Sequence, residues 1–358
     1  MISLLDKMAE GDFEQVLLCN DQASGLRGII AIHDTTLGPA IGGTRMYNYS
    51  SEDEAIDDAL RLAKVMTLKA GAAGLNLGGG SGVIFGNPQK DKTEALLRAF
   101  GRSVASLRGR FIAAEDVGIS VVDIETIGLE TKWVVGTGRS HGGSGNPTFK
   151  AAFGVRRGIQ ACLKHVFGDM NLRDRVIAIQ GIGDVGFELA RLASEDGARL
   201  KVSDLEIRKV DKMKKLFDVE FVPPEEILYT ECDVLSPCAL GGIFDETSVT
   251  RIKARIVAGV ANNQLASESV ADVFQKRNIV YAPDFVINSG GLINVSEELK
   301  GYDETSANSK VSRIFQEIEE ILRISTEKKI STNAAAREKA TDRIRKIRDV
   351  RRTFLPAA

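Results

Sequence analysis

The 358-residue sequence has little of several features that mark special classes of protein. Its four cysteines form no CxxC pair and its three histidines show no metal-ligand spacing, which argues against a disulfide framework or a metal site. The apolar run at the N-terminus is too short for a signal peptide, and no later run has membrane-spanning length. We therefore expect reduced cysteines, no metal, no membrane partner and a cytoplasmic location.

A large excess of charge of one sign is also missing. Lys and Arg total 47 against 49 Asp and Glu, so the net charge of -2 favours neither nucleic acid nor an anionic membrane as a partner. We expect a small-molecule ligand instead. The basic stretch near the C-terminus carries apolar residues at helical spacing, which predicts a solvated helix that docks on its own protein. Its basic residues are Arg343, Arg345, Lys346, Arg348, Arg351 and Arg352.

The length of the chain predicts two domains, since it exceeds the size at which a single core usually stops growing. Residues 136–147 have the most linker-like composition, with glycine, serine and a final proline, and we place the hinge there. The predicted boundaries are residues 1–140 for the first domain, 141–325 for the second and 326–358 for a C-terminal helical segment.

The first domain shows a mixed pattern of strands and helices. Ser51, with Glu54 three residues later, is a typical start for a helix. A run of glycines over 74–82 requires either a tight turn or a close approach of the backbone to another group. A strand that ends on Glu115 and Asp116 places two carboxylates side by side. The other predicted elements are strands over 14–20, 26–33, 83–85 and 110–114 and a helix over 93–107.

The second domain alternates short apolar runs with helical segments, which predicts a parallel, doubly wound sheet. The apolar runs are residues 176–179, 200–202, 234–235, 256–257 and 279–281. The chain is therefore of the α/β class, and it becomes helical again from about residue 307.

A glycine motif, Gly181-Ile-Gly183-Asp-Val-Gly186, lies directly between the first of these runs and a helical segment. That context is typical of dinucleotide binding, because the glycines allow a tight turn, close approach of a pyrophosphate and close helix packing. Asp184 and Val185 complete the loop. Asp204 ends the next strand, where a carboxylate would bind the ribose hydroxyls and repel the extra phosphate of NADP. NAD is the predicted cofactor.

Several longer motifs extend beyond this loop and resemble the Glu/Leu/Phe/Val dehydrogenase family, within it the leucine, phenylalanine and tryptophan enzymes. The resemblance covers nearly the whole chain. The segments that carry it are TLGPAIGGTRM (36–46), MTLK (66–69), AGLNLGGG (73–80), AEDVG (114–118), SGNP (144–147), PCALGG (237–242), ANNQL (261–265) and PDFVIN (283–288).

The resemblance implies reversible, NAD-dependent oxidative deamination of a branched-chain or aromatic L-amino acid to a 2-oxo acid, in a cleft between the two domains. It further implies an N-terminal α/β substrate and oligomerisation domain, a Rossmann-type doubly wound dinucleotide-binding domain and a homo-oligomer. Asp116 matches the catalytic aspartate and Lys69 the lysine that binds the substrate carboxylate. Further substrate-binding candidates are Gly42, Gly43, Met66, Glu115 and Asn263, and further cofactor-binding candidates are Asn146, Ala239, Asn262 and Asn288. For Asn262 and Asn263, capping of a turn is the alternative role.

Two positions depart from the family pattern. The family has a second lysine, twelve residues after the first, as its principal general acid and base, and this chain has Ser81 there. A serine hydroxyl does not titrate near neutral pH, and loss of a general acid or base typically costs about 10² to 10⁴ in rate. Ala151 replaces a threonine that helps to hold the nicotinamide, and its neighbours Phe149 and Lys150 are also unusual.

These departures leave several interpretations open. Ser81 is either an introduced substitution or a natural divergence, and the changes around Ala151 favour divergence. Lys150 could then supply the missing amine, or the enzyme could reduce a preformed imine, for which no water need be activated. A catalytically silent dinucleotide-binding protein is the alternative outside the enzymes.

Overall fold

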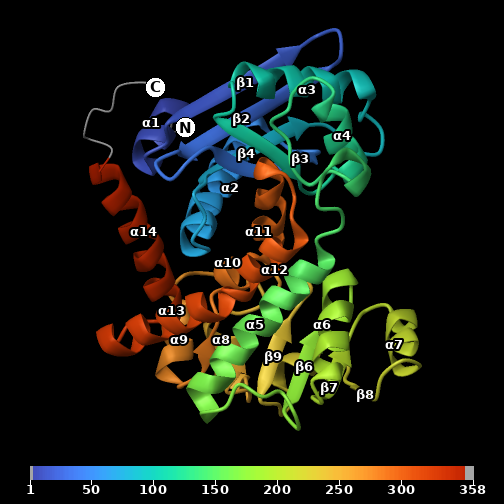
Figure 1. The fold of residues 1–358 in the computed structure, drawn as a ribbon, viewed down its shortest axis with the longest axis vertical. Helices are drawn as coiled ribbons and strands as arrows, with labels where there is room; N and C mark the ends of the chain where they lie inside the picture. Colours follow the sequence, from blue (N-terminus) through green and yellow to red (C-terminus); the bar gives the residue numbers. More distant parts are fainter. Residues whose placement is uncertain (1–2, 351–358) are drawn as a thin grey trace. The chain divides into compact units, whose positions relative to one another are not determined.

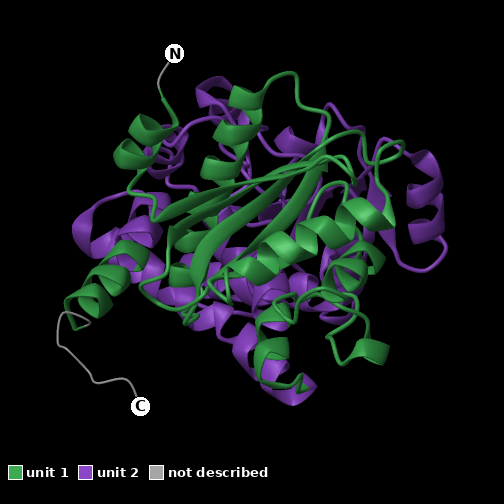
Figure 2. Cartoon of the chain, turned by 90° about the horizontal axis from the view of Figure 1, so that it is seen from above, with its two compact units in different colours: residues 1–146, 295–303, 340–358 green, residues 147–294, 304–339 purple. Residues whose placement is uncertain are grey.

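The computed structural model describes residues 3–350, which form two compact units (Figures 1 and 2). Unit 1 consists of residues up to 146, residues 295–303 and residues from 340 onward, and unit 2 of residues 147–294 and 304–339. The predicted hinge lies at the first of these boundaries. The chain returns to unit 1 twice after leaving it. The domain limits at 140 and 325 stay predictions.

Unit 1 is built on a mixed sheet of five strands in the order β1-β2-β4-β3-β5. The pairs β1·β2 and β2·β4 are antiparallel, whereas β4·β3 and β3·β5 are parallel. The strands are β1 (Gln15–Asp21), β2 (Leu26–Asp34), β3 (Ala40–Tyr47), β4 (Gly78–Phe85) and β5 (Phe111–Glu115).

The glycine-rich segment that the sequence marked for a turn or a close approach is largely a strand. Close approach is the correct alternative for Gly78, Gly79 and Gly80, because each lies against atoms of neighbouring elements. A Cβ at Gly79 would lie 2.1 Å from the backbone nitrogen of Thr67, and one at Gly80 would lie 2.7 Å from the ring of Phe111. The glycines therefore allow a helix and a ring to pack directly on the sheet.

Helices cover both faces of this sheet. Small residues such as Ala59 and Ala63 bring α2 close to one face, and Phe100 of α3 and Ile124 of α4 pack on the other. Ser51 caps α2 as predicted, and its hydroxyl accepts a hydrogen bond from the backbone of Glu54. The helices of unit 1 are α1 (Leu4–Gly11), α2 (Glu52–Ala72), α3 (Glu94–Ser106), α4 (Val121–Gly128), η1 (Arg139–His141) and η3 (Glu297–Lys300).

Unit 2 has a six-stranded sheet in the order β11-β10-β9-β6-β7-β8, and all its strand pairs are parallel. This is the doubly wound order, in which the strand sequence reverses between β6 and β9 and a crevice forms at their carboxyl ends. The strands are β6 (Val176–Gln180), β7 (Arg199–Ser203), β8 (Val219–Phe221), β9 (Val234–Pro237), β10 (Ile256–Val257) and β11 (Val280–Tyr281). The predicted parallel sheet is confirmed.

The remaining helices belong to unit 2 or begin in it, since α11 and α14 continue into unit 1. They are α5 (Thr148–Phe167), α6 (Asp184–Glu195), α7 (Ile207–Lys214), η2 (Ile227–Tyr229), α8 (Glu246–Arg251), α9 (Val270–Lys276), α10 (Asp284–Ile287), α11 (Gly290–Ser296), α12 (Glu304–Ser312), α13 (Ile314–Lys328) and α14 (Thr332–Val350).

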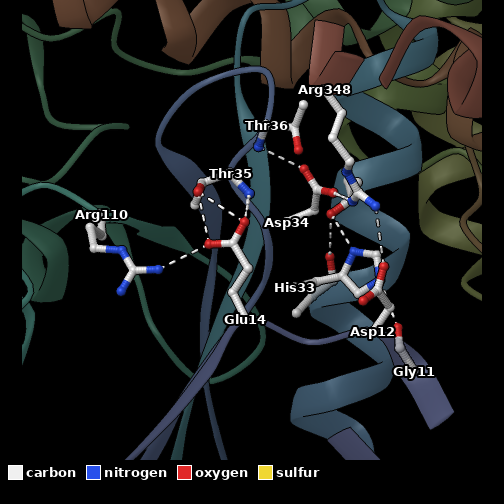
Figure 3. A network of polar contacts seen from close by, with 11 residues as sticks. Gly11, Asp12, Glu14, His33, Asp34, Thr35, Thr36, Arg110 and Arg348 are labelled. Atoms are coloured by element: carbon white, nitrogen blue, oxygen red, sulfur yellow. Dashed lines mark hydrogen bonds and ion pairs between the residues drawn. The ribbon is translucent and has the colours of Figure 1, made fainter. Parts of the chain in front are cut away.

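The last part of α14 docks on unit 1, as the basic stretch predicted. Arg343 donates hydrogen bonds to the carbonyl oxygen of Leu75 and to the side chain of Asn76. Arg348 binds the buried carboxylate of Asp34 at 2.5 Å, which also accepts from the backbone of Thr36 (Figure 3). The predicted basic residues Arg351 and Arg352 lie outside the described residues.

Within residues 3–350, no helix is both long enough and apolar enough to cross a membrane. The four cysteines are free thiols in the structure.

Candidate active site

The loop after β6 has the geometry that its glycines predict. Gly181 has a φ of +88°, and a Cβ there would lie 2.7 Å from the Cβ of Ala239, the residue that follows the end of β9 by two. A Cβ at Gly186 would lie 2.1 Å from the carbonyl oxygen of Gly181. These two glycines therefore let the loop turn sharply and let α6 start directly against it. The contact with Ala239 places the loop at the switch point of the sheet.

Gly183 differs from the other two glycines of the loop. It is the N-cap of α6 with a φ of -65°, and a Cβ added to it would meet nothing within 4 Å. No side chain caps the helix, whose first turn contains Asp184 and Val185. Since no protein atom requires a glycine at this position, the space above it fits the approach of a phosphate to the helix N-terminus.

The carboxylate of Asp204 lies beside this loop. Its two oxygens accept hydrogen bonds from the backbone nitrogens of Ile182 and Glu206, each at 2.9 Å, and Lys209 lies 3.8 Å away. The backbone thus holds the carboxylate at the end of β7, as the ribose role requires. Contact with a ribose itself stays a prediction.

Three predicted asparagines lie together in unit 2. The side-chain amide of Asn288 donates to Asn262 Oδ1 at 2.8 Å and to the carbonyl oxygen of Val260 at 3.2 Å. Asn288 Oδ1 is buried without a hydrogen-bond partner in the part of the chain that the structure describes. Asn263 has a φ of +51°, and its carbonyl oxygen accepts from Gly242. This backbone geometry is compatible with the alternative role of Asn263 in a turn, and its contact with a substrate stays a prediction. The amide pair of Asn262 and Asn288 is suited to a polar ligand group.

In unit 1, Asp116 directly follows β5 as predicted, and neighbouring residues hold it on two sides. A Cβ at Gly43 would lie 2.6 Å from the Cβ of Asp116, so the glycine makes room for the aspartate itself. Arg45 Nε donates to Asp116 Oδ2 at 3.0 Å. Gly43 is thus required by this contact within the protein, and its contact with a substrate stays a prediction.

Sequence reasoning missed a polar network that continues from Arg45. Its Nη1 binds Asp58 Oδ2 at 2.9 Å, and the same carboxylate accepts from Tyr49 at 2.7 Å and from Arg61 at 2.5 Å. Arg45 lies two residues after Gly43 on β3, so strand alternation puts both on the face that α2 covers. The alternation of inward and outward residues along β3 could have indicated this network in the sequence, but the two glycines of the strand obscure it.

Glu115, the predicted supporting carboxylate, is half-buried beside Asp116. Burial, together with the negative charge of Asp116, raises the pKa of Glu115. A carboxyl group of this kind holds a proton to higher pH than an exposed glutamate does.

Ser81 is 1% exposed on β4, and its hydroxyl donates to the carbonyl oxygen of Ala59 in α2 at 2.7 Å. The register of β3 with β4 puts Ser81 alongside Gly43, the residue that contacts Asp116. The serine thus occupies a position next to the candidate catalytic aspartate, but its hydroxyl is bound to a helix backbone.

Three substrate candidates of unit 1 have less defined surroundings. Lys69 and Met66 are half-buried in the last turns of α2. The space beside Gly42 is filled by the carbonyl oxygen of Gly80, 1.7 Å from where a Cβ would lie. Gly42 is therefore required by the contact with β4, and its contact with a substrate stays a prediction.

Lys150 in the first turn of α5 is buried and makes polar contacts with α12. Its ammonium binds Glu304 at 3.1 Å and Asn308 at 2.5 Å. These contacts give the amine a role in holding α12, which weakens the idea that Lys150 replaces the missing catalytic lysine. Phe149 stacks on Phe153, with ring centroids 5.9 Å apart.

The predicted site residues thus fall into two groups. Unit 2 brings the glycine loop, Asp204 and Ala239 together, and separately the asparagine group. Unit 1 brings Asp116, Gly43 and Ser81 together, and Asn146 is its last residue before unit 2. A parallel doubly wound sheet with this loop at its switch point defines a dinucleotide-binding α/β protein, to which unit 1 adds a carboxylate centre.

Comparison with known proteins agrees with this class. Residues 13–137 match the family described as Glu/Leu/Phe/Val dehydrogenase, dimerisation domain, and residues 199–352 match Glutamate/Leucine/Phenylalanine/Valine dehydrogenase. The chain is 48% identical to leucine dehydrogenase of Geobacillus stearothermophilus over 354 residues, which is 99% of this chain and 96% of the relative. It is 41% identical to phenylalanine dehydrogenase of Caldalkalibacillus thermarum, over 96% of this chain and 95% of the relative.

A solved structure of an amino-acid dehydrogenase also has the same fold as this chain. The crystal structure of L-tryptophan dehydrogenase from Nostoc punctiforme superimposes with a TM-score of 0.87 at 42% identity, covering 97% of this chain and 100% of that chain. The chain belongs to the Glu/Leu/Phe/Val dehydrogenase family, whose members are NAD(P)-dependent oxidoreductases.

Proposed function

We propose that the protein is an NAD-dependent dehydrogenase that deaminates a branched-chain or aromatic L-amino acid reversibly to its 2-oxo acid. The observation that carries the proposal is the open space over Gly183 at an uncapped helix N-terminus, combined with the fixed carboxylate of Asp116 in unit 1. The substrate class follows from the leucine, valine, tryptophan and phenylalanine dehydrogenases to which the chain is similar.

Each candidate residue has a role in this chemistry. Lys69 supplies a cation for the substrate carboxylate, and Asp116 supplies an anion for the substrate ammonium and, later, a site for its proton. The Gly183 loop binds the pyrophosphate, and the asparagine pair Asn262 and Asn288 is suited to a carboxamide. The bound nicotinamide would supply the hydride acceptor.

Asp204 is the basis for proposing NAD rather than NADP. Both of its oxygens accept from backbone nitrogens, which fixes a negative charge where the additional phosphate of NADP would lie. Exchange of Asp204 for Asn should narrow the preference for NAD over NADP in kcat/KM. An unchanged ratio of kcat/KM with NAD to kcat/KM with NADP would show that Asp204 does not set the cofactor preference.

Ser81 implies slow deamination, because nothing at that position can take a proton from the attacking water near neutral pH. We expect the wild-type protein to oxidise leucine, valine, phenylalanine or tryptophan slowly with NAD, and Ser81→Lys to be about 10²-fold or more faster. Asp116→Asn serves as the inactive control. Absence of NAD reduction in both the wild type and Ser81→Lys, with cofactor binding retained, would favour the silent dinucleotide-binding protein.

Reduction of a preformed imine is the second candidate function. It is favoured by the hydrogen bond of Ser81 to Ala59, which makes the serine part of the packing under α2 and leaves no group there to activate water. The test compares 2-oxo acid plus methylamine with 2-oxo acid plus ammonia, using NADH. A wild-type rate that is higher with methylamine, where the imine forms in solution, supports imine reduction.

A homo-oligomer is proposed from the match of residues 13–137 to a family described as a dimerisation domain. Light scattering during size-exclusion chromatography tests this proposal. A mass of 38.7 kDa, that of one chain, at micromolar concentration would contradict it.

A further inference from the structure

Two carboxylates share the guanidinium of Arg45. Nε and Nη2 each lie 3.0 Å from Asp116 Oδ2, and Nη1 lies 2.9 Å from Asp58 Oδ2. The arginine side chain is 20% exposed, so it is mostly removed from water. Because a guanidinium is planar and rigid, binding at one edge fixes the direction of the other edge.

Asp58 is the more firmly held of the two carboxylates. It is 14% exposed and also accepts from Tyr49 and Arg61. Burial opposes ionisation of Asp58, but the hydrogen bonds from Tyr49 and Arg61 and the charge of Arg45 outweigh it and lower its pKa. Burial and the hydrogen bond to Asp58 raise the pKa of Tyr49, so the phenol stays a donor. Asp58 is therefore a fixed anion anchored in α2.

Asp116 is held less completely. Arg45 binds only Oδ2, and among residues 3–350 no hydrogen bond or ion pair reaches Asp116 Oδ1. The side chain is 27% exposed, with the backbone of Gly43 against its Cβ. Glu115 on β5 is a further acidic residue beside it. One oxygen is thus occupied by the protein and the other is open to a ligand.

We propose that Asp58 is a positioning residue of the reaction: it holds Arg45 so that Arg45 binds Asp116 Oδ2 and leaves Oδ1 directed at the substrate nitrogen. The inference rests on the proposed function for the role of Asp116. It gives Asp58, Tyr49 and Arg45 an effect on turnover without contact with the substrate. Because Ser81 cannot act as a general acid or base near neutral pH, the rate depends more strongly on the orientation of Asp116.

The first test needs no activity. The Nε–H of Arg45 donates to Asp116, so its exchange with solvent, followed by nitrogen-15 NMR, reports how firmly the arginine is held. Arg45→Lys assigns the signal by removing it. We expect Asp58→Asn to speed this exchange about tenfold or more, and Tyr49→Phe to speed it by a smaller factor.

Asp57→Asn is the matched control, because Asp57 is the adjacent carboxylate of α2, 61% exposed and paired with Lys7. It should change the exchange less than about twofold. An exchange rate in Asp58→Asn equal to that of the wild type or of Asp57→Asn would overturn the proposal, whether or not the protein turns over amino acids.

The second test is kinetic and applies if turnover is found. Asp58→Asn should lower kcat about tenfold with KM for the amino acid changed less than about threefold, since carboxylate binding at Lys69 is separate. Asp58→Glu, which restores the charge, should recover part of kcat. Equal kcat in wild type and Asp58→Asn would overturn the proposal. Absence of turnover in the wild type would instead count against the proposed function, with the exchange test still deciding the role of Asp58.

Discussion

The two units each contain a run of glycines, and the two runs serve different purposes. In unit 1, Gly78, Gly79 and Gly80 lie under atoms of Asp34, Thr67 and Phe111, so the protein itself fills the space that side chains would take. In unit 2, the loop that starts at Gly181 contains one glycine, Gly183, at which an added Cβ would meet no atom of the described residues within 4 Å, apart from its chain neighbours.

The difference shows how to separate packing glycines from ligand glycines. A glycine that clashes with its own protein when a Cβ is added is explained by the fold, whereas one that faces open space at a helix N-terminus is explained by a ligand.

The largest effect is expected for Gly79→Ala. The new Cβ would lie 2.1 Å from the backbone nitrogen of Thr67 and 2.4 Å from the carbonyl oxygen of Ala63, and neither backbone atom can move without shifting α2. We expect a loss of about 3 kcal/mol or more in the free energy of unfolding, measured in urea. Gly128→Ala, with only a valine methyl 3.3 Å away, is the control and should stay within about 1 kcal/mol. Similar losses in both would contradict this explanation of the glycine run.

Gly183→Ala should give the opposite result. The unfolding free energy should change by less than about 1 kcal/mol. Alanine adopts this φ without strain, no atom is displaced, and its smaller unfolded-state entropy offsets the preference of an N-cap for glycine. The dissociation constant for NAD should rise about tenfold or more, since a methyl group would occupy the phosphate position. Calorimetric titration with NAD measures this dissociation constant in the wild type and the variant. Wild-type affinity in the variant would refute the assignment of this glycine to the cofactor.

A smaller effect is expected for Ser81→Ala. Removing the hydroxyl deletes its hydrogen bond to Ala59 and should cost about 1 kcal/mol of stability, with turnover unchanged. Ser106→Ala, at an exposed position on α3, provides the stability control. A tenfold fall in turnover for Ser81→Ala alone would mean that the serine takes part in the chemistry.

The smallest effect concerns pH. Burial removes the His33 ring from water and lowers its pKa, although the charge of Asp34 and the contact with the carbonyl oxygen of Gly11 oppose this shift (Figure 3). The unfolded chain therefore binds this proton more tightly than the folded protein. Stability should be highest above the ordinary histidine value of about 6.5 and fall as the pH drops through the lower, folded value. Thermal melts of wild type and His33→Gln between pH 5 and 8 test this, and equal slopes would contradict it.

The dinucleotide loop was predictable because its requirements are local. A strand, three glycines and a helix follow one another within a short stretch, and Asp204 ends the next strand. By contrast, β3 and β8 were not predicted. The glycines of β3 hide the alternation of inward and outward residues, and β8 has only three residues.

The network around Asp116 was only partly predictable. The aspartate itself could be found from its place at the end of a strand, whereas its partner Arg45 lies 71 residues away and reaches it through the register of β3 with β5. Asp58 comes from yet another element. Contacts of this kind depend on tertiary packing, which no local pattern encodes.

The return of α14 to unit 1 has a consequence for synthesis. While the ribosome makes the roughly 200 residues between the first part of unit 1 and Arg343, about 10 to 40 s pass. Throughout this interval the carboxylate of Asp34 and the carbonyl oxygen of Leu75 lack their arginine partners. Unit 1 is thus begun first and completed last, and a nascent chain that stops before Arg343 would carry a finished nucleotide fold beside an unfinished first unit.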